Sequence, residues 1–149
     1  MIARNDYLQK LIDRMNNGMI KVVTGIRRCG KSYLLFEIFY NYLLQNGVDK
    51  EHIISLQLDD RMNIRYRDPD FLCEYVHSKI VDEKNYFILL DEVQYVNEFE
   101  DVLISFLHIK NADVYVTGSN AKFLSSDIIT EFRGRGDQIH LSPLSFKEY

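Results

Sequence analysis

A glycine-rich segment near the N-terminus has the residue types and spacing that bind phosphate. Residues 25–32 read Gly-Ile-Arg-Arg-Cys-Gly-Lys-Ser, which fits the pattern GxxxxGK[ST]. Glycines let consecutive backbone N–H groups turn toward an anion, and the following helix aims its positive end at that anion. Lys31 would reach the terminal phosphates, and the Ser32 hydroxyl would coordinate Mg²⁺. The expected cofactor-binding residues are Gly25, Ile26, Arg27, Arg28, Cys29, Gly30, Lys31, Ser32 and Tyr33.

Two adjacent acids follow an apolar run further along the chain, in the segment Phe-Ile-Leu-Leu-Asp91-Glu92. Asp91 would hold the Mg²⁺ opposite Ser32, and Glu92 would orient and polarise an attacking water. Acids at a strand end also occur as solvated turns or helix caps, but the phosphate loop upstream favours the catalytic interpretation. A water-activating acid at this place indicates a hydrolase of the additional-strand type rather than a P-loop kinase. The strand predicted at 52–58 lies between the two motifs, as the additional-strand type requires.

Polar residues later in the chain are candidates for sensing the bound phosphate. The predicted strand 113–117 runs into Ser119 and Asn120, and either side chain would meet the γ-phosphate or the water; Asn120 is our prediction for the sensor. Capping of the next helix is the structural alternative. Arg133 and Arg135 flank a glycine and are candidates for the cation that stabilises transition-state charge. A solvated loop is the alternative for both, and the sequence does not choose between them.

The elements that must position these residues alternate between strands and helices. Short apolar or β-branched runs predict strands, and apolar residues at i, i+3, i+4 and i+7 predict helices. Such alternation is typical of an α/β fold whose mainly parallel sheet carries helices on both faces and binds ligands at the carboxyl ends of its strands. The predicted strands are 19–24, 52–58, 86–90, 113–117 and 138–141, and the predicted helices are 7–15, 35–46, 70–80, 99–107 and 121–132.

Composition narrows the possible functions. Of the 149 residues, the first 32 carry seven basic and two acidic side chains. The remaining residues carry eleven basic and twenty acidic side chains. The acidic remainder argues against non-specific binding of nucleic acid by the whole surface, while the basic start suits a local anion. Cys29 and Cys73 have no partner at ligand spacing and are expected to be reduced thiols. With no apolar run long enough for a membrane and no signal peptide, we expect a cytoplasmic location.

These motifs, in this order, resemble those of the AAA+ superfamily of P-loop ATPases. More narrowly, the sequence is similar to archaeal and bacterial ATP-binding proteins with the segments GxRRxGKS, LLDEVQ, TGSN and PLSFKEY, which stand here at 25–32, 89–94, 117–120 and 143–149. The resemblance implies a three-layer P-loop NTPase fold with a mainly parallel five-stranded sheet, ATP and Mg²⁺ as cofactors, and Mg²⁺-dependent ATP hydrolysis coupled to conformational change. It also implies that Arg133 or Arg135 is an arginine finger that acts across a homo-oligomer.

The resemblance also predicts parts that this sequence lacks. Members of the superfamily follow the α/β base with a helical lid, and members of the narrower family add a C-terminal nuclease-like domain; neither follows Tyr149. We therefore expect residues 1–149 to be a single base domain of a truncated chain. Two alternatives to the ATPase remain: a nucleotide-gated interaction module with negligible turnover, and a nucleic-acid-associated motor or defence ATPase. The nucleic-acid or protein effector and the preference for ATP over GTP stay open.

Overall fold

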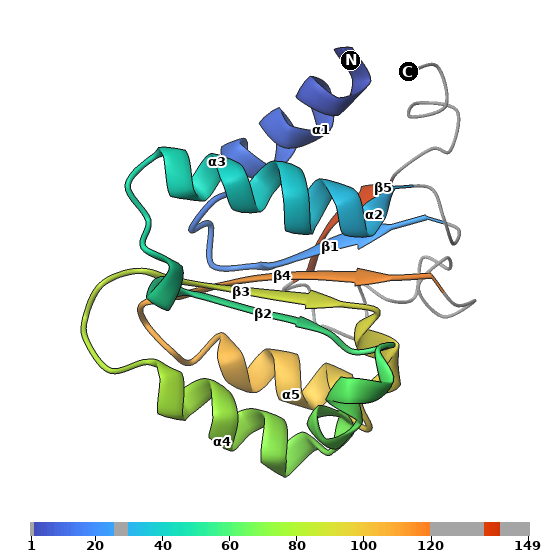
Figure 1. The fold of residues 1–149 in the computed structure, drawn as a ribbon, viewed down its shortest axis with the longest axis vertical. Coiled ribbons are helices and arrows are strands. Elements are labelled where there is room, and N and C mark those ends of the chain that lie inside the picture. The colour runs from blue at the N-terminus through green and yellow to red at the C-terminus, as the bar shows by residue number, and fades with distance from the viewer. Residues whose placement is uncertain (1, 26–29, 120–135, 141–149) are drawn as a thin grey trace.

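The fold is built on a twisted sheet of parallel strands (Figure 1). The computed structural model describes residues 2–25, 30–119 and 136–140. Within these ranges the sheet has five strands in the order β2-β3-β4-β1-β5, and every neighbouring pair is parallel. The α/β prediction with a parallel five-stranded sheet is therefore confirmed. The strands are β1 (Ile20–Thr24), β2 (Ile53–Gln57), β3 (Tyr86–Asp91), β4 (Ala112–Gly118) and β5 (Gly136–His140).

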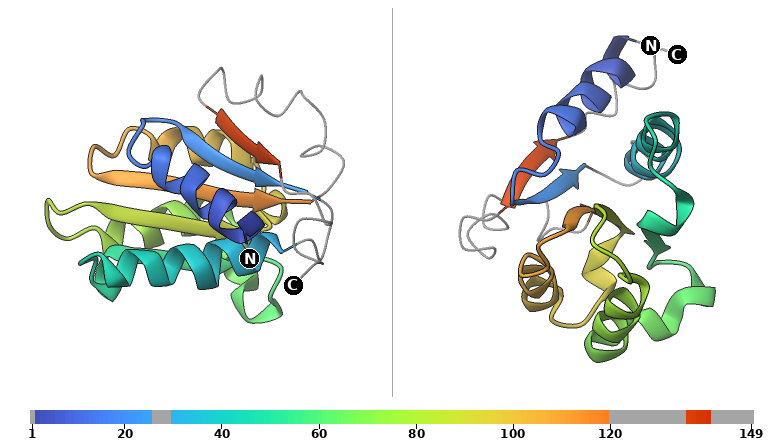
Figure 2. Two further views of the ribbon diagram at one scale, coloured as in Figure 1. Left: turned by 90° about the horizontal axis from the view of Figure 1, so that it is seen from above. Right: turned by 90° about the vertical axis from the view of Figure 1, so that its left-hand side faces the viewer.

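Helices cover both faces of the sheet and make three layers. The helices are α1 (Ile2–Asp13), a continuous helical stretch formed by α2 (Lys31–Tyr33), a π-helical segment (Leu34–Phe39) and α3 (Tyr40–Gln45), then α4 (Pro69–Lys79) and α5 (Phe99–Phe106). Short 3-10 helices span Lys50–His52, Arg61–Arg67 and Val93–Tyr95. Helices α4 and α5 lie on one face, and the stretch from α2 to α3 lies on the other (Figures 1 and 2). None of the helices among the described residues has the length and apolar character needed to cross a bilayer.

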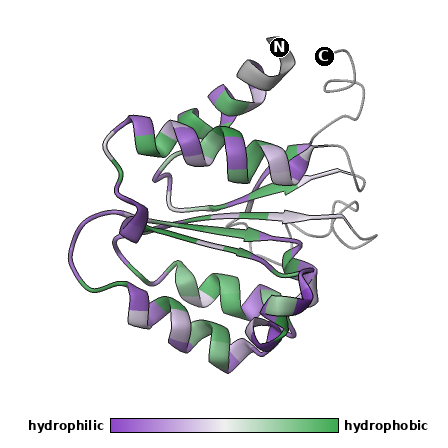
Figure 3. Cartoon of the chain, viewed as in Figure 1, coloured by the Kyte–Doolittle hydropathy of each residue, from purple (hydrophilic) through white to green (hydrophobic). Residues whose placement is uncertain are grey.

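Each face of the sheet has its own apolar core, and both are visible as hydrophobic strands and inner helix faces in Figure 3. In β3, Ile88 and Leu90 pack with α4 and α5, while Phe87 and Leu89 pack with the helical stretch on the other face. Side chains alternate between faces along a strand, so a strand covered on both sides is apolar throughout. Leu11 of α1 joins the second core, which fixes this helix against the same face as α3.

The helix after the phosphate loop differs from its prediction. It begins at Lys31, directly after Gly30, as the phosphate-loop pattern expects, but its middle six residues are π-helical. Helix α1 ends at Asp13 rather than residue 15, and β5 spans 136–140 rather than 138–141. The predicted helix 121–132 lies outside the described residues. Cys73 is a free thiol, as expected, and Cys29 also lies outside the described residues.

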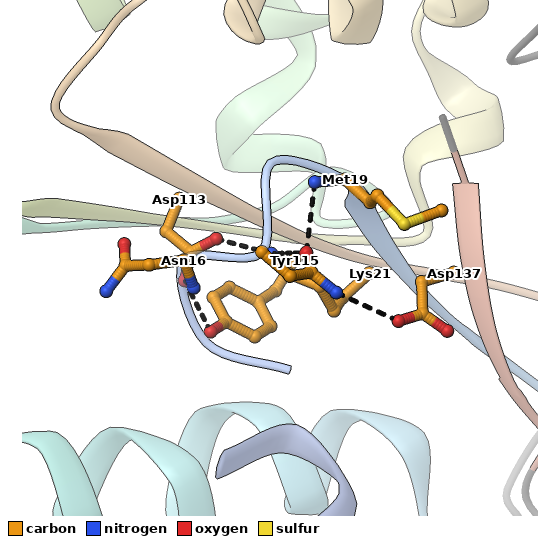
Figure 4. A network of polar contacts seen from close by, with 7 residues as sticks. Asn16, Met19, Lys21, Asp113, Tyr115 and Asp137 are labelled. Atoms are coloured by element: carbon orange, nitrogen blue, oxygen red, sulfur yellow. Dashed lines mark hydrogen bonds and ion pairs between the residues drawn. The ribbon is translucent and has the colours of Figure 1, made fainter. Parts of the chain in front are cut away.

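A buried ion pair joins strands at the amino ends of the sheet (Figure 4). Lys21 on β1 is fully buried and its ammonium pairs with Asp113 on β4. The Tyr115 hydroxyl donates to Asp113 Oδ2 at 2.6 Å, and the Asn16 backbone N–H donates to the same oxygen at 2.8 Å. Burial lowers the pKa of Lys21, while the Asp113 carboxylate opposes that shift. The Asp113 carboxylate is thus the main compensation for a buried positive charge.

Polar residues before β1 extend this network to the sheet edge. Asn17 Oδ1 accepts from Lys21 Nζ at 3.1 Å and from the Met19 backbone N–H at 3.0 Å, while Asn17 Nδ2 donates to Asp137 at 3.0 Å. Arg14, just beyond α1, forms an ion pair with Asp137 at 3.1 Å. The network therefore ties the end of α1 to β1, β4 and β5 at the edge of the sheet opposite the phosphate loop.

Candidate nucleotide-binding site

The candidate site lies where the carboxyl ends of β1, β3 and β4 meet the start of α2. These three strands are parallel neighbours, so their ends reach the same edge of the sheet (Figure 1). Strand β1 leads into Gly25, and α2 starts at Lys31. Gly25 and Gly30 have φ of 152° and 101°, a region in which a side chain is strained. The glycines at both ends of the motif are therefore required by the backbone.

The hydroxyl of Ser32 is in direct contact with the first acid. Ser32 Oγ donates to Asp91 Oδ2 at 2.6 Å, and the Thr117 hydroxyl on β4 donates to Asp91 Oδ1 at 2.5 Å. Mg²⁺ takes oxygen ligands, usually one or two from protein with the rest from water and substrate phosphates. The Ser32 hydroxyl and the Asp91 carboxylate fit that requirement. Among the described residues no cluster of three or more His, Cys, Asp or Glu side chains is placed to hold a metal.

Asp91 is ionisable and 3% exposed, which makes its charge unfavourable. Burial raises the pKa of Asp91, and the hydrogen bonds from Ser32 and Thr117 oppose this shift; the charge of Glu92 adds to it. A buried carboxylate with a raised pKa is destabilising when ionised and gains from a nearby cation. The electrostatics of Asp91 therefore suit a residue that binds a metal ion.

Replacing Asp91 with Asn is expected to raise the free energy of unfolding at pH 7 in EDTA by about 1 kcal/mol. The folded protein holds the Asp91 proton more tightly than the unfolded chain, so stability falls as pH rises from the unfolded pKa through the folded one. The Asn side chain keeps an acceptor for Thr117 without the charge. Urea unfolding measures the change, with Asp6→Asn on exposed surface as the control. A loss of stability in Asp91→Asn would contradict the prediction.

The second acid is held by both its backbone and its side chain. Glu92 has a φ of 54°, which is uncommon for a residue other than glycine, and its N–H donates to the Thr117 hydroxyl at 2.8 Å. Its Oε1 accepts from Ser119 Oγ and from Gln94 Nε2, each at 2.7 Å. Glu92 also lines a pocket of about 300 Å³. The other lining residues are Gly30, Lys31, Ser32 and Tyr33.

Several residues expected from the sequence line this pocket or contact a residue that lines it, namely Gly30, Lys31, Ser32, Tyr33, Asp91, Glu92 and Ser119. Gly25 lies directly after β1, where its positive φ favours glycine. The others lie outside the described residues: Ile26, Arg27, Arg28, Cys29, Asn120, Arg133 and Arg135. Two residues were missed by the sequence reasoning. Thr117 and Gln94 stand inside the segments TGSN and LLDEVQ that carry the family resemblance, which was an available signal, but neither was given a role.

The comparisons with known proteins agree with this arrangement. A family model described as "AAA domain" matches residues 17–149. The chain belongs to that family. With the parallel sheet described above, it is an AAA+ P-loop ATPase domain, as the motifs predict, and its family indicates a nucleotide-binding, ATPase-like function.

Two curated relatives of this AAA domain are considerably longer proteins. An uncharacterized protein of Haemophilus influenzae is 37% identical over 151 residues, which cover all of this chain and 37% of the relative. The uncharacterized protein MJ1544 of Methanocaldococcus jannaschii is 34% identical over 134 residues, covering 87% of this chain and 28% of the relative. The chain thus spans about a third of the length of these relatives.

Solved structures share the fold of this AAA domain at low sequence identity. PCH-2 of C. elegans has a TM-score of 0.62 at 12% identity, over 92% of this chain and 42% of that one. A chain of Drosophila ORC bound to DNA has a TM-score of 0.60 at 10% identity, and the match covers 93% of this chain and 89% of that one. ORC1 of Aeropyrum pernix, in complex with DNA, has a TM-score of 0.60 at 13% identity, and the match covers 93% of this chain and 45% of that one. At these identities the likeness concerns the fold.

Proposed function

We propose that this AAA domain binds Mg²⁺·ATP in the pocket at Lys31 and hydrolyses it. The observation that carries the proposal is the 2.6 Å contact between Ser32 Oγ and Asp91 Oδ2, beside a pocket lined by Lys31 and Glu92. One residue from each motif thus comes to a single place, although the two motifs are far apart in the sequence. Family membership supports the same activity.

Each side chain has a distinct task in the proposed reaction. Lys31 binds the β- and γ-phosphates, and Ser32 and Asp91 hold the metal ion. When bound, Mg²⁺ neutralises charge that develops on the phosphate oxygens. Glu92 orients the attacking water and accepts its proton. The pocket walls at Gly30 and Tyr33 hold the nucleotide against the start of α2, where backbone N–H groups point toward an anion.

Residues outside the described ranges complete the proposal. Asn120 is proposed as the sensor of the γ-phosphate, next to Ser119, which already contacts Glu92. Arg133 or Arg135 is proposed as the finger that acts on a neighbouring copy, which makes the functional unit a homo-oligomer. Hydrolysis is proposed to drive a conformational change.

Thermal unfolding with and without nucleotide tests the proposal. Mg²⁺·ATP at about 100 times its dissociation constant stabilises the folded state by about 2.7 kcal/mol, which raises the melting temperature of a domain of this size by about 5–10 °C. Lys31→Ala is expected to abolish the shift, because Lys31 is the only positively charged side chain among the described pocket-lining residues. Lys110→Ala, on exposed surface, is the matched control. An unchanged melting temperature of the wild type in millimolar Mg²⁺·ATP would overturn the proposal.

A further inference from the structure

We propose that Gln94 is a positioning residue that aims the Glu92 carboxylate at the attacking water; this inference rests on the proposed ATP hydrolysis. Gln94 lies two residues after Glu92, in the short 3-10 helix Val93–Tyr95. Its Nε2 donates to Glu92 Oε1 at 2.7 Å. A general base must point at the water as well as offer it a free lone pair. A side-chain amide that donates to one oxygen of the Glu92 carboxylate fixes the direction in which the other oxygen points.

The two oxygens of the Glu92 carboxylate differ in their hydrogen bonds, because the side-chain donors contact only Oε1 among the described residues. Ser119 Oγ donates to the same Oε1 at 2.7 Å, so in the described part of the chain both side-chain donors meet one oxygen. Glu92 lines the pocket beside Lys31 and Ser32, and Oε2 is the oxygen left to accept a proton from water. Two donors from different elements, the turn after β3 and the end of β4, fix the rotation of this carboxylate.

The backbone removes the remaining freedom of Glu92. Its φ of 54° is held by the hydrogen bond from its N–H to Thr117 Oγ1 at 2.8 Å. Strained backbone of this kind persists where the surrounding contacts over-determine it, and it clusters at active sites. With the main chain fixed by Thr117, the side-chain direction depends on the contacts of Gln94 and Ser119.

Gln94 occupies its position at a cost to stability. Its Oε1 is buried and accepts no hydrogen bond from the described residues, and a buried acceptor without a partner destabilises the folded state. Exchanging the amide O and N would not help, because it would place an oxygen against Glu92 Oε1. A polar group kept where an apolar one would be more stable is typical of a residue placed for function.

The first experiment measures kcat, nucleotide affinity and stability of Gln94→Met. Met has a similar length and no donor. We expect kcat for ATP hydrolysis to fall about tenfold or more, because a hydrogen bond to a charged group is lost. We expect the dissociation constant of Mg²⁺·ATP to change by less than about twofold, since no binding contact is removed, and the melting temperature to equal or exceed that of the wild type. Gln45→Met, on exposed surface at the end of α3, is the matched control.

A double-mutant cycle separates positioning from a structural role. If Gln94 acts through Glu92, then Gln94→Met has no further effect on kcat in a Glu92→Gln background, because the two residues work as one unit. Single-turnover measurements with labelled ATP give the slow rates of that background. A merely structural role lowers stability and affects both backgrounds equally.

The outcomes distinguish this inference from the proposed function. A Gln94→Met protein that hydrolyses ATP as fast as the wild type overturns the positioning role and leaves the ATPase proposal intact. A loss of kcat that is matched by a lower melting temperature, or that recurs in full in the Glu92→Gln background, also overturns it. A wild-type protein that fails to bind or to hydrolyse Mg²⁺·ATP overturns both proposals.

Discussion

Glu92→Gln is expected to lower the rate of ATP hydrolysis by about 10²–10³-fold while leaving Mg²⁺·ATP bound. The variant keeps nearly the same volume, and its side-chain oxygen still accepts from Ser119 and Gln94, which donate to Oε1 in the wild type. It lacks the negative charge needed to take a proton from water. The proposed metal and phosphate contacts of Ser32, Asp91 and Lys31 are not altered by the substitution, so we expect the loss in kcat and not in affinity.

The measurement pairs phosphate release with direct nucleotide binding on both proteins. Glu98→Gln is the matched control, since Glu98 lies on exposed surface. If the wild type and Glu92→Gln bind Mg²⁺·ATP equally and both show the same negligible hydrolysis, then the nucleotide acts as a switch. The domain would then be a nucleotide-gated interaction module, the alternative that the sequence left open.

The parts of the site that lie within one motif were predictable from the sequence. Residues 25–32 can be recognised without knowing the rest of the fold, because glycines, a lysine and a hydroxyl at that spacing suit a phosphate. Asp91 and Glu92 were equally visible at the end of an apolar strand. Their contact with Ser32, however, depends on β3 lying two strands from β1, and periodicity predicts parallel strands without their order.

The sequence predicts that the end of strand 113–117 lies beside the end of the Asp91 strand, and the structure pairs these strands, but the side chains that join them were not predictable. Thr117 bonds both Asp91 and the backbone of Glu92 only because β4 is the neighbour of β3. In the sequence, Thr117 is the last residue of the predicted strand 113–117 and the first of the segment TGSN, and it was given no role of its own. The π-helical segment after α2 was missed for a related reason: its apolar residues satisfy an α-helical period closely enough, and packing on the sheet decides the hydrogen-bond pattern.

Lys21 shows the same limit in the core. A lysine within a β-branched run is expected to reach solvent from the sheet surface, and its partner Asp113 is a residue of a distant strand. The structure instead buries Lys21 completely between β4 and β5, with Asp113 beside it. Without the strand order, nothing connects these two charges.

Lys21→Met is therefore expected to reduce the free energy of unfolding by about 3–5 kcal/mol, the usual cost of leaving one charge of a buried pair without its partner. Asp113 would keep its hydrogen bonds from Tyr115 and Asn16 but lose its counter-charge. Urea unfolding at pH 7 measures the change, and Lys110→Met on exposed surface controls for the loss of a lysine. A change below about 1 kcal/mol would contradict the expectation.

The double variant Lys21→Met with Asp113→Asn shows whether charge is the cause. Asn at position 113 still accepts from Tyr115 and Asn16 but needs no counter-ion, so the double variant is expected to be more stable than Lys21→Met alone. If packing around Lys21 were the cause, the second substitution would add to the loss. Because this network lies at the opposite edge of the sheet from Lys31, the folded fraction of either variant should bind Mg²⁺·ATP with the affinity of the wild type.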